Sequence, residues 1–189
     1  YSGEIALYGD AHGGDAKIVI ASYNHSTSIH RFLTEQTSDI SAGAYGAFSI
    51  LSGRVNDILQ YVDRVEKVTP AGEKAEVANQ VGQLYALRGL AHLELARIFS
   101  YLPTTGVNPD AAYSGIPLNN EVRPVGYAYQ RSTLRETYAQ IISDLTKSLE
   151  GLSKEKTLNS GYVNYWAAEA LLARAYLYLG DWQNAYKYA

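Results

Sequence analysis

The chain has 189 residues, of which 47% are hydrophobic, and 16 basic against 19 acidic side chains give it a formal net charge of −3. This size permits a well-buried core, and the mixed order of the charges excludes a basic stripe of the kind that binds nucleic acid. The absence of cysteine excludes disulfides, thiolate metal sites and cysteine nucleophiles, and no apolar run approaches the roughly 20 residues of a membrane-spanning helix.

Residues 1–43 are rich in glycine and short polar side chains, which favour turns over a packed helix face. We therefore expect a loop-rich segment with one or two short helices. Within it, Asp10, His12 and Asp15 have a spacing that suits either a metal ion or a turn closed by aspartate hydrogen bonds, and we favour the turn. We expect no metal and no cofactor.

Tyrosine is unusually frequent in this chain, with 17 occurrences. A tyrosine ring can pack against a helix, or it can offer a flat face to a sugar while its hydroxyl meets water. Sugars also pair their hydroxyls with planar amide and guanidinium groups. A polar and aromatic cluster near the start of the chain is therefore a candidate ligand site, with ordinary loop solvation as the alternative. Its members are Tyr23, Asn24, His25, His30, Arg31 and Tyr45.

Apolar residues at steps of three and four predict two long helices, over residues 44–68 and 73–101. The stripe of the first is Phe48, Leu51, Val55, Ile58, Val62 and Val65. The stripe of the second is Val77, Val81, Leu84, Leu87, Ala91, Leu95, Ile98 and Leu102. Gly82 and Gly89 inside the second helix each cost up to about 1 kcal/mol against alanine, which indicates close approach by a neighbouring helix.

Several charged residues lie in apolar stretches of the predicted helices. An arginine in such a position usually pairs with a carboxylate between packed helices, and we expect this of Arg88, Arg97 and Arg174. His92 is expected to pack between helices. None of these side chains is assigned a ligand role.

Residues 103–130 form a long connection that contains several prolines. A loop of this length is uncommon inside a compact domain, so it is either functional or held down by Ile116 and Leu118. Three tyrosines in it are candidates for the mouth of the ligand site or for a partner interface: Tyr113, Tyr127 and Tyr129.

The remaining helices have clear start and stop signals. Thr133 and Glu136 have the spacing of a capping box, which predicts a third helix from residue 133 to about residue 152. Gly180 and Asp181 suit the end of one helix and the N-cap of the next, which predicts a final pair over 165–179 and 182–189. The fold class is therefore all-α, with irregular tetratricopeptide-like helical repeats over residues 44–189.

Four sequence blocks occur in an order that resembles the SusD/RagB family of outer-membrane nutrient-binding lipoproteins. They are Arg-Val-Asn-Asp-Ile-Leu at 54–59, the arginine-bearing stretch 84–99, Gly-Ile-Pro-Leu at 115–118 with residues 131–145, and residues 168–189 with their Gly-Asp-Trp turn. The resemblance covers the chain from about residue 45 to its end. It implies one N-terminal domain over residues 1–189, with the C-terminal part of the family missing.

The same resemblance implies a function and a location. Members bind oligosaccharides or other nutrients at the cell surface of Bacteroides-like bacteria and hand them to a TonB-dependent, SusC-like transporter. Attachment to the outer membrane would come from a lipid anchor outside this sequence. The alternative is a tetratricopeptide-type adaptor that binds a protein or peptide. The usual catalytic motifs are missing from the sequence, so we expect no enzyme activity.

Overall fold

The computed structural model describes residue 31, residues 39–155 and residues 161–189. The chain divides into two compact units, Tyr1–Ala47 and Phe48–Ala189. The helices are α3 (Asp39–Leu59), α4 (Val62–Val68), α5 (Lys74–Phe99), α6 (Leu134–Gly151), α7 (Tyr165–Leu179) and α8 (Trp182–Tyr188), with short 3₁₀ turns η1 (Ala71–Glu73) and η2 (Pro103–Thr105). The predicted all-α class is confirmed. Among the described helices, none combines the length and apolar character needed to cross a bilayer.

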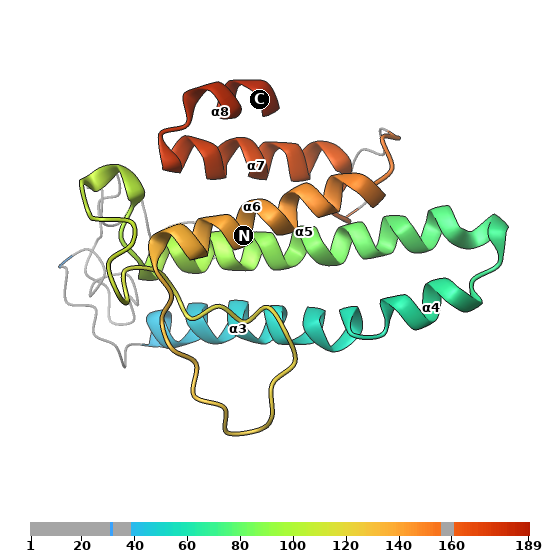
Figure 1. Ribbon diagram of the computed structural model, residues 1–189, viewed down its shortest axis with the longest axis horizontal. Coiled ribbons are helices and arrows are strands. Elements are labelled where there is room, and N and C mark those ends of the chain that lie inside the picture. Colours follow the sequence, from blue (N-terminus) through green and yellow to red (C-terminus); the bar gives the residue numbers. More distant parts are fainter. Residues whose placement is uncertain (1–30, 32–38, 156–160) are drawn as a thin grey trace, which may run out of the picture. The chain divides into compact units, whose positions relative to one another are not determined.

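The second unit is a stack of antiparallel helices, as expected for tetratricopeptide-like repeats. In Figure 1, α6 runs back along α5, α7 runs back along α6, and α8 returns over α7. The main core lies between α5, α6 and α7, and the connection before α6 adds one residue to it. Its buried members are Leu93, Leu95, Ala96, Ile116, Leu134, Tyr138, Ile141, Leu145, Leu172 and Ala175.

The first predicted helix, over residues 44–68, is two helices in the structure. The helical hydrogen-bond pattern breaks after Leu59, where the Tyr61 amide donates to the Ile58 carbonyl instead of continuing the four-residue ladder. The carbonyl of Asp57, which would have accepted that bond, accepts from the Gln60 side chain at 3.0 Å. The break also leaves the predicted stripe only partly buried, with Ile58 53% exposed and Val65 44% exposed.

The second predicted helix is confirmed, but its predicted apolar stripe is wrong over most of its length. Of the stripe residues only Ala91 and Leu95 are buried, whereas Gly82, Ala86 and Gly89 are buried outside the stripe. Every residue from Ala91 to Ala96 is buried, including the polar side chains of His92 and Glu94. The reason is that α5 packs against α6 and also contacts α7 and α4, so it is covered on more than one side. A single-stripe pattern describes a helix with one covered face, so it underestimates the burial of α5.

The predicted close approach at the glycines of α5 is confirmed. A methyl group on Gly82 would lie 2.8 Å from the Ser148 carbonyl oxygen of α6, and one on Gly89 would lie 2.8 Å from the Leu145 side chain. The two helices therefore meet nearly backbone to backbone.

The predicted start and stop signals are confirmed. The Thr133 side chain accepts from the Glu136 amide, and the Glu136 carboxylate accepts from the Thr133 amide at 2.8 Å. Gly180 ends α7 with φ +74°, and the Asp181 side chain caps α8 by accepting from the Asn184 amide at 3.1 Å.

Candidate functional site

The long connection before α6 is closed at its base by backbone pairing. The Gly115 amide donates to the Ser132 carbonyl and the Ser132 amide donates to the Ile116 carbonyl, both at 2.9 Å, and Pro117 and Arg131 form an isolated β-bridge. Ile116 is fully buried, and Leu118 packs against the same core. The expectation that these two residues hold the connection down is confirmed. Residues 118–130 therefore form a closed loop, here called the 118–130 loop.

A buried charge network lies beneath this loop. The Arg88 guanidinium of α5 donates to both carboxylate oxygens of Asp144 in α6, at 2.9 and 2.6 Å. Another of its nitrogens donates to the Asn56 side-chain oxygen at 2.7 Å and to the Asn120 carbonyl at 2.9 Å. The Arg88 and Asp144 side chains are 8% and 1% exposed. The network thus joins α3, α5, α6 and the loop through one arginine.

Asn56 completes the anchoring of the loop. Its side-chain amide donates to the Asn119 carbonyl and side-chain oxygen, both at 3.0 Å, and to the Glu121 carbonyl at 3.3 Å. The Asn120 side chain donates to Gln140 of α6 at 3.1 Å. Because residues 119–121 are held by side chains of three helices, the part of the loop that follows them starts from a fixed position.

His92 lies beside this network and does not join it. Its Nδ1 is 3.9 Å from Asp144, and neither ring nitrogen has a hydrogen bond among the described residues. Burial lowers the pKa of His92 to about 4, against the opposing effect of the Asp144 carboxylate. The predicted packing role of His92 agrees with this burial, and the histidine is neutral at pH 7.

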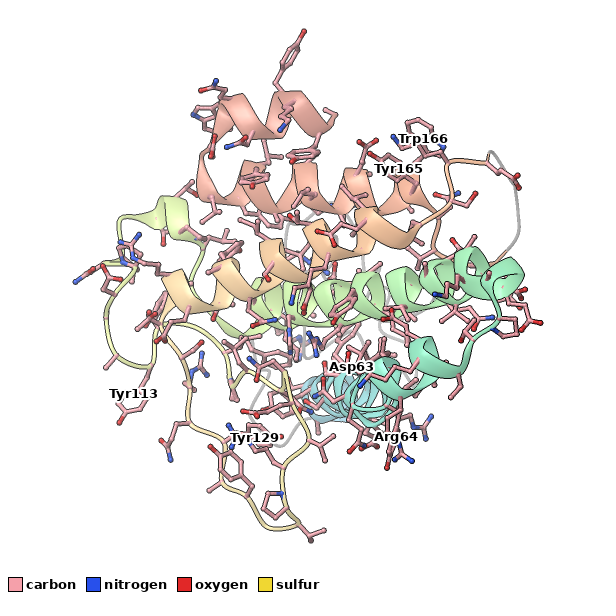
Figure 2. The ribbon with its side chains drawn as sticks, turned by 45° about the vertical axis from the view of Figure 1, so that its right-hand side comes forward. Asp63, Arg64, Tyr113, Tyr129, Tyr165 and Trp166 are labelled. Atoms are coloured by element: carbon pink, nitrogen blue, oxygen red, sulfur yellow. The ribbon has the colours of Figure 1, made fainter. Side chains whose placement is uncertain are left out.

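Two of the predicted tyrosines meet on the 118–130 loop. The rings of Tyr127 and Tyr129 contact edge to face, with centroids 4.9 Å apart, and they are 46% and 38% exposed. The Arg123 guanidinium lies 4.8 Å from the centre of the Tyr127 ring. Arg123, Tyr127 and Tyr129 are called the tyrosine platform below. Figure 2 shows Tyr129 on the loop that projects from the helical stack.

The tyrosine platform is tied to the anchored base of the loop. The Tyr129 hydroxyl donates to the Asn119 side-chain oxygen at 2.9 Å, and Arg123 forms an ion pair with Glu121. Partial burial raises the pKa of the Tyr129 hydroxyl, so it remains a donor at neutral pH. The tight turn that precedes Tyr127 has Gly126 at φ +84°, a backbone conformation that glycine adopts without strain.

A pocket of about 390 Å³ lies between the helices and the start of the same loop. It is lined by Asn56, Leu59, Gln60, Tyr85, Arg88, Asn120, Glu121, Val122 and Lys147. The Tyr85 ring has two cations near it, because Arg88 and the Lys147 ammonium each lie 5.4 Å from its centre. Glu121 links the pocket to the tyrosine platform through its ion pair with Arg123.

The structure describes three of the other predicted site residues. Tyr113 is exposed with φ +62°, and in Figure 2 it projects from its own part of the connection, apart from Tyr129. Tyr45 is partly exposed on α3, and Arg31 is exposed in a turn. Tyr23, Asn24, His25 and His30 lie outside the described residues, as do Asp10, His12 and Asp15. Within the described residues, no group of three or more acidic or histidine side chains has the arrangement of a metal site.

The expected pairing between helices is found for Arg88 and Arg174 but is wrong for Arg97, whose partner lies in its own helix. Arg88 pairs between two helices, whereas Arg97 bonds to Glu94 one turn earlier in α5, at 2.6 Å. Arg174 of α7 lies 3.8 Å from the same Glu94. Sequence reasoning missed the contributions of Asn119, Arg123, Tyr85 and Lys147. Of these residues, only Arg123 could have been found from the sequence. It precedes Tyr127 by four residues, in the connection whose tyrosines were predicted as candidates.

Comparison with known proteins agrees with this architecture. A family model described as SusD-like, starch-binding and associating with the outer membrane matches residues 14–177. A Bacteroides vulgatus protein, provisionally described as sugar-binding, is 30% identical over 100% of this chain, with a TM-score of 0.86. This chain covers 40% of that protein. No curated protein matches the chain.

More distant solved structures share the fold. A SusD superfamily protein from Bacteroides thetaiotaomicron is 24% identical with a TM-score of 0.77, covering 97% of this chain and 39% of its own length. A laminarin-binding SusD-like protein is 20% identical with a TM-score of 0.66, covering 85% of this chain and 31% of its own length. The chain thus spans well under half of these relatives. The family model covers most of the sequence and the helical stack is shared, so the chain belongs to the SusD-like family.

Proposed function

We propose that the chain is part of a cell-surface carbohydrate-binding protein, and that the tyrosine platform contributes to its ligand site. The observation that carries this proposal is the exposed, mutually packed Tyr127–Tyr129 pair, with a guanidinium over one ring, on a loop with a hydrogen-bonded base. The family's starch-binding description supports the choice of ligand class.

The chemistry of the platform suits a sugar. The apolar face of a pyranose ring stacks on aromatic rings, and its hydroxyls take hydrogen bonds from guanidinium and amide groups. Tyr127 and Tyr129 would provide the rings, and Arg123 and Asn119 the polar groups. Because the base of the loop is fixed before a ligand arrives, binding loses less conformational entropy than it would on a free loop.

The acidic groups near the pocket favour binding without catalysis. Glycoside hydrolysis generally uses two carboxylates on either side of the scissile bond. Here Glu121 is paired with Arg123, and Asp144 is buried behind Arg88. We therefore propose a ligand that is captured and released unchanged.

Location and partner follow from the family as proposals. The family description associates its members with the outer membrane. We propose a lipid-anchored protein on the outer face of that membrane, delivering its ligand to a TonB-dependent transporter of the SusC type. Affinity purification from native membranes tests this: such a transporter should be recovered with the protein. Recovery of the protein alone under mild detergent would contradict the partnership.

The carbohydrate proposal is tested by removing the two rings. Oligosaccharides that bind the purified protein on a glycan array are titrated calorimetrically against Tyr127→Ala and Tyr129→Ala. Each substitution should weaken binding about fivefold or more, since truncating an aromatic contact residue commonly costs over about 1 kcal/mol. Tyr186→Ala, at an 86% exposed position on α8, is the matched control and should leave affinity unchanged.

Two results would contradict the proposal. Oligosaccharide binding that is unaffected by either loop substitution would move the site away from the platform. Binding of peptides in the absence of any oligosaccharide binding would instead favour a tetratricopeptide-type adaptor.

A further inference from the structure

We propose that the pocket beside the tyrosine platform binds the carboxylate of an acidic sugar, so that the ligand is a uronate-containing oligosaccharide. This inference rests on the proposed carbohydrate-binding function and specifies its ligand class. The pocket is the one between the helices and the start of the 118–130 loop, with Tyr85, Arg88, Lys147 and Glu121 in its lining. Its hydrogen-bonding groups, its charge and its position each favour a carboxylate ligand.

Each amide side chain of the pocket already uses at least one of its N–H donors within the protein. The Asn56 amide donates to the loop backbone, the Asn120 amide donates to Gln140, and the Gln60 amide donates to the Asp57 carbonyl. These neutral groups, which often recognise sugar hydroxyls, are therefore fixed as structural supports. One amide N–H of Asn120 and one of Gln60 remain, and the other donors left to face a ligand belong to the cations and to the Tyr85 hydroxyl.

Arg88 and Lys147 are the two cations of the lining. They differ in how many of their N–H donors already have partners within the protein. A guanidinium has five N–H donors, and Arg88 uses four of them on Asp144, Asn56 and Asn120. Its charge is balanced by Asp144. Lys147 forms no ion pair among the described residues, and its ammonium lies against the Tyr85 ring. One Arg88 donor and the Lys147 ammonium group therefore remain for a ligand.

The net charge of the lining follows from these pairings. Glu121 is neutralised by Arg123 and Arg88 by Asp144, which leaves the charge of Lys147 unbalanced. Hydrogen bonds between ionised partners are shorter and stronger than neutral ones. A carboxylate would thus gain more in this pocket than a hydroxyl in the same position.

The size and position of the pocket fit one unit of an oligosaccharide. Its volume of about 390 Å³ lies at the lower end of the range for small-molecule sites. Glu121 belongs to the pocket and also contacts Arg123 of the tyrosine platform. A sugar chain stacked on the platform can therefore place a neighbouring uronate in the pocket.

The test uses single sugars, so that pocket binding is measured without the platform. Backbone and side-chain NMR signals of the ¹⁵N-labelled protein are followed during titration with D-galacturonate and, separately, with D-galactose. Galacturonate should shift the signals of Tyr85, Lys147 and Glu121, and galactose should shift them far less. Raising the salt concentration should weaken the galacturonate response, because a partly exposed ion pair is screened.

Matched charge variants locate the effect. Lys147→Gln should weaken galacturonate binding about two- to fivefold, the range expected for a solvent-accessible charged contact. Lys154→Gln is the control, because Lys154 also lies over a tyrosine, 4.6 Å from the ring centre of Tyr165, but lies outside this pocket. It should leave the galacturonate response unchanged.

Three outcomes would overturn the inference: no shifts at the pocket residues, equal responses to the two sugars, or equal loss of binding in the two lysine variants. The double variant Tyr127→Ala/Tyr129→Ala separates this inference from the proposed function, since it should keep the galacturonate response. If neutral oligosaccharides bind the platform and galacturonate gives no response, the carboxylate site in the pocket is refuted and the proposed function stands. A galacturonate response without any oligosaccharide binding would refute the platform alone.

Discussion

The arginine–aspartate pair beneath the 118–130 loop shows how strongly burial determines the contribution of an ion pair to stability. Arg88 and Asp144 are almost fully buried and bonded through two contacts. Arg135 and Asp110 form a pair of similar geometry, but their side chains are 64% and 57% exposed. The Arg88–Asp144 pair is largely removed from water, so each of its charges is stabilised mainly by the other. The second pair keeps water as an alternative partner.

Replacing Arg88 should therefore lower the stability of the protein strongly. Arg88→Ala leaves Asp144 buried without its partner and releases Asn56 and Asn120, and we expect a loss of about 3–5 kcal/mol in the free energy of unfolding. Urea denaturation followed by circular dichroism measures this. Arg135→Ala should leave the unfolding midpoint nearly unchanged. Similar losses in the two variants would show that burial does not set the importance of these pairs.

Residue patterns predicted part of this network. An arginine in an apolar helical stretch indicates a buried carboxylate partner, and that partner exists. Its identity was not predictable, because Asp144 lies 56 residues away and several acidic residues have similar local patterns. The role of Asn56 was equally hidden, since an asparagine in a helix gives no local sign that it will hold a distant loop.

At the scale of elements, the contact between α5 and α6 depends on glycine. Gly82 and Gly89 lie seven residues apart and so face the same side of α5. A side chain at Gly82 would meet the backbone of α6, which has little freedom to move. The helix gives up intrinsic stability at these two positions and gains closer packing.

Gly82→Ala should consequently destabilise the protein, although alanine is the better helix former. We expect a loss of about 1–3 kcal/mol, typical of overpacking a filled interface, measured by thermal or urea unfolding. Gly53→Ala in α3 is the control, because its added methyl would meet only the Asn119 side chain at an ordinary 3.5 Å. That variant should be unchanged or more stable by up to about 1 kcal/mol. Stabilisation by Gly82→Ala would mean that the helices separate at low cost.

Element boundaries were predictable where a local signal defines them. The Thr133–Glu136 capping box and the Gly180–Asp181 turn act through neighbouring backbone groups, so the sequence predicts them directly. The break between α3 and α4 was missed, because it depends on the Gln60 side chain competing for a helical carbonyl. A period-based pattern cannot register that competition.

At the scale of the molecule, the stack buries a histidine whose protonation is coupled to folding. His92 has a pKa of about 4 in the folded protein, whereas an unfolded chain would show about 6.5. Between these values the unfolded state binds the proton and the folded state does not. The free energy of unfolding should therefore fall as the pH is lowered from about 6.5 to 4, and this residue contributes about 3 kcal/mol to that loss.

His92→Leu should remove this contribution while keeping a side chain of suitable size. Denaturant midpoints measured at several pH values between 7 and 4 should slope less steeply in the variant than in the parent protein. The variant should also gain stability at low pH relative to the parent, because its unfolded state no longer gains a histidine proton that the folded state does not bind. Parallel slopes for the two proteins would show that His92 does not govern acid stability.

The way the 118–130 loop is held has a consequence for how binding preferences can change. Every residue from 121 to 130 is exposed, while the hydrogen bonds that fix the loop involve its two ends and residues 119–121. New residues, or a few additional ones, can be introduced between 122 and 129 without disturbing any buried side chain, since lengthening a surface loop costs little. Under the proposed function, the helical stack and the binding loop can therefore change separately in evolution, and grafting this short stretch should change the ligand preference of the same stack.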